Sequence, residues 1–390
     1  MRDVLVICPQ ERDLIAIEAA GVERRFRVRY AGSDLDQLES FDPRAFLEEC
    51  DAIPADGVVG SKDQSALLAA LIAERRALPG PSAQALVACQ HKPTSRALQE
   101  LAAPGAVPGF ALLGDEPPFE FPFFVKPVVG RLSQNTFRVD SPEDLLGLHE
   151  IDRYTTRYAQ IAELAGLAPD AVHGFLAEEL LTGMEVTYEG YVHAGRVTTI
   201  GVTDSVKYPG TNSFERFEYP TVLSAERQAE IEGIVARVLP ALGFDGGFFN
   251  VELFVPERGP AKVIEVNGRI ASQFAPLVQA LHGRSTYDAL FVLACGEDPL
   301  WRSGIPDGVG VSYCLRVFAD AFVEAVPDPE DGLEVLVRPG LRLSDQGVND
   351  AQSYRLCILY GVGETREEAV RLCRERARAL SFRLAPVRVR

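Results

Sequence analysis

The sequence predicts an α/β (α+β) protein with a mixed, largely antiparallel central sheet. Strand and helix patterns alternate over the first 80 residues or so, which is typical of a small parallel α/β domain. From residue 177 onward strand patterns follow one another, and a hairpin pattern covers residues 248–269. We therefore expect a parallel sheet first and antiparallel strands later in the same chain.

The N-terminal elements are expected from short apolar runs and helical periodicity. They are strands at Val4–Cys8, Phe26–Tyr30 and Gly57–Gly60, and helices at Asp13–Ala20 and Asp63–Arg76. Leu78–Pro81 then breaks the chain, and one helix is expected from about Ala83 to Leu101. Several prolines indicate irregular connections before the apolar strand Phe123–Val128.

Later elements follow the same reasoning. We expect strands within Ala177–Val202, an irregular polar stretch at Thr203–Pro220, a helix at Ala225–Leu242, tail strands at Val311–Phe318, Glu334–Arg338 and Tyr354–Tyr360, and a last helix at Arg366–Leu380. Thr365 is the expected N-cap of that last helix.

Composition and charge narrow the class of protein. The chain has 390 residues, 47% of them hydrophobic and 24% charged, as in an ordinary globular protein of two to four domains. A net charge of −17 argues against nucleic-acid binding, although local cations can still create a site for a small anion. Seven cysteines without a C-x-x-C pair indicate reduced thiols and a cytoplasmic location. No apolar run reaches about 18 residues, so we expect no membrane partner.

Two glutamates on the expected hairpin form the most informative feature. Its strands are Phe248–Val255, FFNVELFV, and Val263–Arg269, VIEVNGR. A four-residue loop at Glu257–Pro260 would place Glu252 directly opposite Glu265. Two acids facing each other destabilise an antiparallel pair, so this arrangement suggests a cation between the strands.

Neighbouring residues extend this candidate site. The same register pairs Asn250 with Asn267, and the alternation of side chains puts Glu265, Asn267 and Arg269 on one face. Carboxylate and amide oxygens suit a hard ion such as Mg²⁺. A solvated sheet face is the alternative, but the opposite faces of both strands are strongly apolar, which favours a site.

Two lysines and one further strand segment stand out. Lys126 ends an apolar strand in FFVKPVVG, whereas Lys92 begins a helical stretch and could be an ordinary surface lysine. The segment Ala177–Val192 reads as an extended hinge, whose backbone can bond an adenine edge and whose acids can hold ribose hydroxyls. A solvated strand edge is the alternative. The P-loop and dinucleotide-binding glycine motifs are absent, which argues against a P-loop ATPase and a dehydrogenase.

Taken together, these residues resemble the ATP-grasp superfamily, most closely its carboxylate–amine ligase branch. The resemblance covers roughly Pro79–Pro299, and Glu265–Phe274, EVNGRIASQF, is its most specific piece. It implies an ATP-grasp fold with an N-terminal parallel α/β domain (1–85), a two-lobed ATP-binding region (86–176 and 177–305) and a C-terminal α+β lobe (306–390).

The resemblance also implies a role for each candidate residue. Lys92 and Lys126 would contact the ATP phosphates, Glu178 with the backbone of Glu179 and Leu181 the adenine, Glu185 the ribose, Glu252, Glu265 and Asn267 the Mg²⁺ ions, and Arg269 the carboxylate substrate. Lys126 and Arg269 would be the catalytic residues. We expect two Mg²⁺ ions, with Mn²⁺ as an alternative.

Two further segments concern contacts with phosphate and substrate, and the first departs from the family pattern. The glycine-rich lid expected after the strand lysine is thin in Val128–Thr136, where Arg131 or Ser133 could take its place. Lys207 and Tyr208 lie in the polar stretch before the hairpin, and we expect them to contact substrate or phosphate; an exposed mobile loop is the alternative.

The function implied by the resemblance is an ATP-dependent ligase that joins a carboxylate to an amine of small substrates through an acyl phosphate. A carboxylase of the biotin or purine type and a non-catalytic nucleotide-binding sensor remain as alternatives. The partners would be small molecules, and a homodimer is common in the superfamily.

Overall fold

The computed structural model describes residues 1–131, 134–148, 153–302, 304, 306–346, 350 and 352–387. Within them the strands form a three-stranded, an eight-stranded, a four-stranded and a two-stranded sheet. The first is parallel and the others are antiparallel, as the alternation of sequence patterns predicts.

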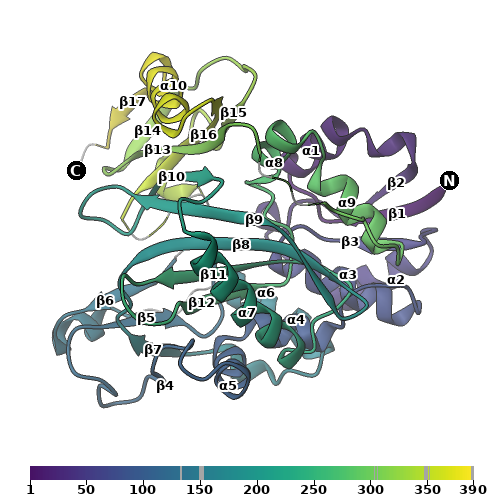
Figure 1. Ribbon diagram of the computed structural model, residues 1–390, viewed down its shortest axis with the longest axis horizontal. Coiled ribbons are helices and arrows are strands. Elements are labelled where there is room, and N and C mark those ends of the chain that lie inside the picture. The colour runs from purple at the N-terminus through teal and green to yellow at the C-terminus, as the bar shows by residue number, and fades with distance from the viewer. Residues whose placement is uncertain are drawn as a thin grey trace.

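The N-terminal sheet has the strand order β2-β1-β3. Its strands are β1 (Arg2–Ile7), β2 (Phe26–Ala31) and β3 (Gly57–Val59), and its helices are α1 (Glu11–Ala20), α2 (Pro43–Asp51) and α3 (Asp63–Arg75), with 3-10 turns at Val22–Arg24 and Leu35–Gln37. Two helices from much later in the chain, α8 (Ala275–His282) and α9 (Thr286–Ala294), lie beside this domain, and α9 packs against α1 and β3 (Figure 1). The N-terminal domain is therefore fixed to the middle of the chain.

The single helix expected from Ala83 to Leu101 is wrong. The chain forms α4 (Ala83–Gln90) and α5 (Lys92–Ala102), separated by His91, whose ψ of 98° is not helical. Pro93 explains the break, because proline has no N–H to bond the preceding turn and is tolerated only near a helix start. The ring of His91 caps the new helix at the backbone N–H of Thr94.

The four-stranded sheet forms a small lobe with the order β4-β7-β5-β6. Its elements are β4 (Phe110–Leu112), β5 (Phe123–Pro127), β6 (Phe137–Val139), β7 (Phe175–Glu179) and helix α6 (Arg153–Leu164), with 3-10 turns at Pro142–Gly147 and Pro169–Val172. Because β7 lies between β4 and β5, the strand bearing Lys126 runs next to the strand bearing Glu178.

The eight-stranded sheet, in the order β12-β11-β8-β9-β10-β13-β16-β15, runs through the middle of the molecule (Figure 1). Its strands are β8 (Met184–His193), β9 (Arg196–Lys207), β10 (Phe214–Tyr219), β11 (Phe248–Val255), β12 (Lys262–Asn267), β13 (Val309–Val317), β15 (Leu333–Val335) and β16 (Tyr354–Gly363). The irregular stretch expected at Thr203–Pro220 is therefore wrong, because β9 and β10 occupy most of it. Polar side chains there sit on paired strands rather than in a loop.

The remaining elements cover this sheet. They are α7 (Ala225–Ala241), β14 (Ala321–Ala325), β17 (Arg383–Pro386), a 3-10 turn at Leu343–Asp345 and α10 (Arg366–Ala379). The expected N-cap Thr365 accepts a hydrogen bond from the backbone of Glu368. None of the described helices is long and apolar enough to cross a bilayer. All seven cysteines are free thiols.

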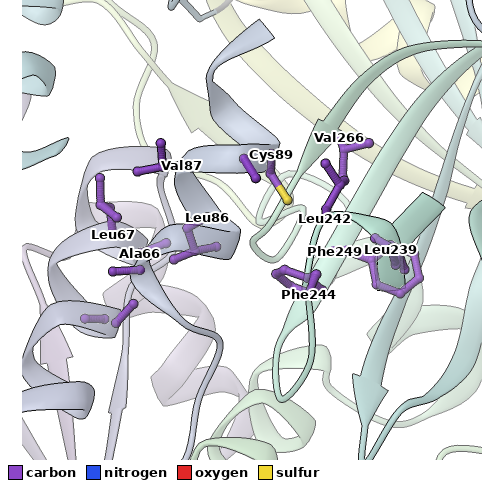
Figure 2. Packing of buried hydrophobic residues seen from close by; sticks show 14 of the residues in the cluster. Ala66, Leu67, Leu86, Val87, Cys89, Leu239, Leu242, Phe244, Phe249 and Val266 are labelled. Atoms are coloured by element: carbon purple, nitrogen blue, oxygen red, sulfur yellow. The ribbon is translucent and has the colours of Figure 1, made fainter. Parts of the chain in front are cut away.

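One buried core joins the N-terminal domain to the large sheet (Figure 2). Leu67 of α3 and Leu86 of α4 come from one side, whereas Leu239 of α7, Phe249 of β11 and Val266 of β12 come from the other. All five side chains are essentially buried. Helix α4 therefore fixes the position of the hairpin relative to the N-terminal domain.

Candidate active site

The register of the hairpin confirms the facing acids. Glu252 pairs with Glu265 and Asn250 with Asn267. The turn assumed in that prediction is wrong, because Phe254 pairs with Lys262 and the register shifts by one residue between Glu252 and Leu253. A β-bulge at Ile264 supplies the extra residue, so the two glutamates face each other despite the different turn.

The bulge also supplies a hydrogen-bond acceptor. The carbonyl oxygen of Ile264 accepts a bond from Lys126 Nζ at 3.1 Å and from Arg96 Nη2 at 2.6 Å. Ladder pairing is interrupted at a bulge, so this carbonyl is available to side chains. It ties two cations of the small lobe and α5 to the large sheet.

The expected extension of the second strand to Arg269 is wrong, since β12 ends at Asn267. Gly268 follows, where a side chain would meet Leu86 at 2.5 Å and Phe244 at 2.9 Å, so only glycine allows this close approach. Asn250 Nδ2 then donates to the carbonyl oxygen of Arg269 at 3.0 Å. The turn directs the arginine away from the ladder.

The side chain of Arg269 is anchored from the N-terminal domain. Its Nε donates to Asp63 Oδ1 at 2.7 Å, and its Nη2 donates to Asn267 Oδ1 at 3.3 Å. Burial opposes its charge, but Asp63 and then Glu252 stabilise it and leave the pKa of Arg269 raised. The planar cation is thus held beside the two facing acids.

Electrostatic strain at the facing acids is visible in Glu252. Burial, then the charges of Glu265 and Glu185, raise the pKa of Glu252 to about 8. Asn267 Nδ2 donates to Glu252 Oε1 at 3.2 Å, and this bond and the charge of Arg269 oppose the rise in the pKa of Glu252. A cation placed between the acids would remove this repulsion.

The donor set fits Mg²⁺ held jointly with phosphate oxygens. No three Asp, Glu, His or Cys side chains among the described residues lie close enough to hold a metal ion by themselves. Glu252, Glu265 and Asn267 instead provide two carboxylates and one amide. Mg²⁺ takes six oxygen ligands and commonly uses one or two carboxylates with substrate phosphates and water.

The two predicted phosphate lysines lie on the neighbouring small lobe and α5. Lys92 Nζ forms an ion pair with Glu265 Oε1 at 3.2 Å. Lys126 Nζ lies 2.8 Å from Glu178 Oε2, and burial lowers the pKa of Lys126 to about 8. Both ammonium groups are buried, which is where a phosphate would stabilise them.

Glu178 has partners other than the adenine edge expected for it. It is buried, and its two oxygens are held by Lys126 and by Arg96 Nε, the latter at 2.6 Å. Burial opposes its ionisation, but these two cations outweigh burial and hold the pKa of Glu178 at about 2. The carboxylate positions Lys126. The adenine contacts of Glu178, Glu179 and Leu181 remain predictions, and the N–H of Glu179 donates to the Gly109 carbonyl.

The expected ribose acid also has a cation partner. Glu185 Oε2 lies 2.8 Å from Lys207 Nζ, whose ammonium lies over the rings of Phe214 and Phe254 at 5.5 and 5.4 Å. Lys207 is on β9 and faces the same region as Glu185, whose charge acts on Glu252. Ribose binding by Glu185 remains a prediction.

Tyr208 and Arg131 also have partners within the chain, and their contacts with substrate or phosphate remain predictions. The hydroxyl of Tyr208 donates to the carbonyl of Cys314 in β13 at 2.9 Å, and its ring packs edge-on against Phe318. The guanidinium of Arg131 forms an ion pair with Asp36 of the N-terminal domain. Ser133 lies outside the described residues.

Sequence reasoning missed three charged residues at this site. Arg96 lies one helical turn after Lys92, and that spacing on α5 was an available signal. Asp63 begins α3 at the carboxyl end of a parallel strand, where α/β proteins commonly bind ligands. Glu189, whose Oε1 accepts the N–H of Ala271 at 3.1 Å, is buried, and burial raises its pKa to about 8.

The comparisons with known proteins identify the fold. Residues 119–276 match the sequence profile of the ATP-grasp domain, and the whole chain has the ATP-grasp fold. No significant match was found among curated proteins.

Solved structures with this fold cover nearly the whole chain. The L-amino acid ligase from Bacillus licheniformis is 18% identical with a TM-score of 0.79, and the similarity covers 98% of each chain. The phosphoribosylglycinamide synthetase from Anaerococcus prevotii is 14% identical with a TM-score of 0.68 over 98% of this chain and 99% of that one. The N5-carboxyaminoimidazole ribonucleotide synthetase from Thermotoga maritima is 15% identical with a TM-score of 0.69, over 99% and 100%. At these identities the likeness establishes the fold.

Proposed function

We propose that the chain is an ATP-dependent carboxylate–amine ligase that forms an amide or peptide bond between small substrates, amino acids or short peptides. The observation that carries this proposal is the facing pair of Glu252 and Glu265, set between a buried lysine and Arg269. The two facing carboxylates would bind a divalent cation, the lysines would bind phosphate oxygens, and Arg269 would bind a carboxylate. These are the three charged components of such a reaction.

The reaction would proceed in two steps. A carboxylate oxygen attacks the γ-phosphorus of ATP, the bond to ADP breaks, and an acyl phosphate forms. The amine then attacks the acyl carbon, inorganic phosphate leaves, and the nitrogen loses a proton. Because a free carboxylate does not react with amines, phosphorylation provides the leaving group.

Each residue has a separate part in these steps. Lys92 and Lys126 would neutralise phosphate oxygens as charge shifts between them. Glu252, Glu265 and Asn267 would hold Mg²⁺, which when bound supplies charge neutralisation and orientation of the phosphates. Arg269 would orient the carboxylate and bond the oxyanion of the tetrahedral intermediate; removing such a donor commonly lowers the rate by about 10²–10³.

Phosphate entry has to compete with existing ion pairs. Lys126 is bound to Glu178 and Lys92 to Glu265, so nucleotide binding exchanges carboxylate partners for phosphate. Glu178 also retains Arg96, and therefore stays compensated if Lys126 turns toward a phosphate. Lys126 can therefore bind a phosphate without leaving the buried carboxylate of Glu178 unpaired.

The test is ATP turnover with defined substrates. Purified protein is supplied with Mg²⁺, ATP and pairs of amino acids, and ADP, phosphate and the product are measured, the product by mass spectrometry. ADP and a condensed product formed only when both a carboxylate and an amine are present support the ligase. Bicarbonate-dependent turnover without an amine would support a carboxylase instead, and nucleotide binding without turnover would support a sensor.

The free cysteines support a reducing, cytoplasmic location as part of this proposal. A homodimer remains a prediction that the oligomeric state in solution would test.

A further inference from the structure

Arg355 is a buried cation without an acidic partner among the described residues. It lies on β16 and is 9% exposed. Its Nη1 donates to the neutral amide oxygen of Gln273 at 3.4 Å, and its buried Nε has no hydrogen-bond partner. Burying an unpaired charge is strongly unfavourable, so an anion is the component missing here.

Three arginines on neighbouring elements have acidic partners, which makes Arg355 unusual. Their ion pairs are Arg12–Glu334 at 2.7 Å, Arg269–Asp63 at 2.7 Å and Arg316–Asp350 at 2.7 Å. Arg316 is a neighbour on the adjacent strand, and the two guanidinium groups repel each other. No acid is therefore left over for Arg355 among these pairs.

Arg355 reaches the segment that begins with Arg269. Gln273, which accepts a hydrogen bond from Arg355, lies four residues after Arg269, and its Nε2 donates to Ser312 Oγ at 3.0 Å. On the preceding residue, Ser272 Oγ accepts from Lys62 Nζ at 3.4 Å. Two cations, one from the N-terminal domain and one from the C-terminal lobe, thus contact successive residues of the segment that follows Arg269.

Lys62 adds to the local positive charge. It forms no ion pair within the described part of the chain, and its neighbours include Arg12 and Arg269 as well as Asp13. Asp13 is already held by the hydroxyls of Ser61 and Tyr287. Lys62 and Arg355 therefore both lack an acidic partner among the described residues, although the chain carries a net charge of −17.

We propose that Arg355, assisted by Lys62, binds the free carboxylate of an α-amino acid that acts as the amine substrate. This inference rests on the proposed ligase function and names the class of its second substrate. The edge formed by Nε and Nη2 has no partner among the described residues and can hold a carboxylate with two parallel bonds. An α-amino acid carries such a carboxylate one carbon away from its nucleophilic nitrogen.

Arg269 and Arg355 would each bind the carboxylate of a different substrate. Arg269, beside the facing acids, would hold the carboxylate that is phosphorylated, whereas Arg355 would hold a carboxylate that survives the reaction. An amine without a carboxylate would leave Arg355 unpaired. A site with an unpaired buried charge discriminates strongly against such an analogue.

The test separates acyl-phosphate formation from amine binding. Each of the twenty standard L-amino acids is supplied as acyl donor with ATP, Mg²⁺ and hydroxylamine, an amine without a carboxylate, and the hydroxamate is measured. For donors that react, each amino acid is then compared with its own carboxamide as the acceptor. The variants are Arg355→Gln, Arg355→Lys and, as a matched control, Arg342→Gln, whose guanidinium is exposed and bound to Asp320.

We expect Arg355→Gln to raise the KM of the amino-acid acceptor by about 10- to 100-fold, the range for losing a charged hydrogen bond. Hydroxamate formation and the KM of the donor should not change, and Arg342→Gln should change neither. Carboxamides should be poor acceptors for the wild type, and Arg355→Gln should leave their KM unchanged. Arg355→Lys keeps the positive charge but loses the two parallel N–H donors of the guanidinium, so it should give an intermediate KM. This variant provides a second measurement if the glutamine variant folds poorly.

Three outcomes would contradict the inference. An equal loss of hydroxamate and amide formation in Arg355→Gln would give Arg355 a structural or donor-side role. Carboxamides accepted as well as amino acids would exclude carboxylate recognition. An unchanged acceptor KM in both Arg355 variants would also refute it. By contrast, no hydroxamate from any donor with the wild type would contradict the proposed function itself.

Discussion

Replacing Glu252 with glutamine should stabilise the metal-free protein in a pH-dependent way. The pKa of Glu252 is raised from 4.5 to about 8, so the folded state retains a proton that the unfolded state has already lost between these values. The free energy of unfolding therefore falls as pH rises from about 4.5 to about 8. The change Glu252→Gln removes this penalty and keeps the bond from Asn267.

The size of the effect follows from the pKa shift. At 1.36 kcal/mol for each pKa unit, the shift corresponds to an upper bound of about 5 kcal/mol. Because the side chain of Glu252 is partly exposed, solvent screening reduces this to about 2–4 kcal/mol. Glu252→Gln should therefore match the wild type near pH 4.5 and exceed its stability by that amount at pH 8.

Urea unfolding at pH values from 4.5 to 8, in EDTA and without nucleotide, measures the difference directly. Glu265→Gln is the matched control, because it also relieves the repulsion but removes the ion pair of Lys92, so its gain should be smaller. With Mg²⁺ and ATP added, the wild type should gain more stability than either variant, since ligand binding stabilises the folded state by mass action. A difference between Glu252→Gln and the wild type that is constant with pH would refute the reasoning.

Three further perturbations have defined outcomes. Glu178→Gln leaves Lys126 and Arg96 without a buried carboxylate and should lower the free energy of unfolding by about 3–5 kcal/mol at pH 7 in urea titrations. Because the pKa of Glu178 is held at about 2, the ionised carboxylate contributes its full stabilisation above pH 4.5. The difference in stability between the wild type and the variant should therefore vanish as the pH falls through 2. Asp63→Asn should loosen Arg269 and raise the KM of the carboxylate substrate about tenfold, with unchanged ATP affinity by calorimetry; an equal loss of ATP affinity would contradict a positioning role. Chelation of divalent ions by EDTA should abolish turnover and weaken ATP binding, and restoring Mg²⁺ should recover both.

Local sequence rules predicted the hairpin acids well because their signals are local. Alternation along two apolar strands fixes which side chains share a face, so Glu252 and Glu265 followed from the pattern even with the wrong turn. The bulge at Ile264 has no sequence signal of its own, because the bulged residue is not a glycine. Its carbonyl accepts hydrogen bonds from Lys126 and Arg96, which are distant in the sequence. Its position depends on groups more than 130 residues away.

Long-range ion pairs were the least predictable part of the site. Glu178 followed from the hinge pattern, but its partner Arg96 lies 82 residues earlier on a helix. Asp63 and Arg269 are 206 residues apart and meet only because α4 packs the hairpin against the N-terminal domain. Tertiary packing rather than local periodicity decides which of these charges meet.

The bulged carbonyl of Ile264 makes part of this site invisible to conventional mutagenesis. Substitutions at position 264 alter the side chain but leave the oxygen that accepts from Lys126 and Arg96, so an alanine scan should find the position tolerant. Only a change in the main chain, such as an amide-to-ester replacement between residues 264 and 265, would weaken this acceptor. Variation among natural or laboratory sequences at this position is therefore compatible with strict conservation of its role, and tolerance to substitution there is no measure of its importance.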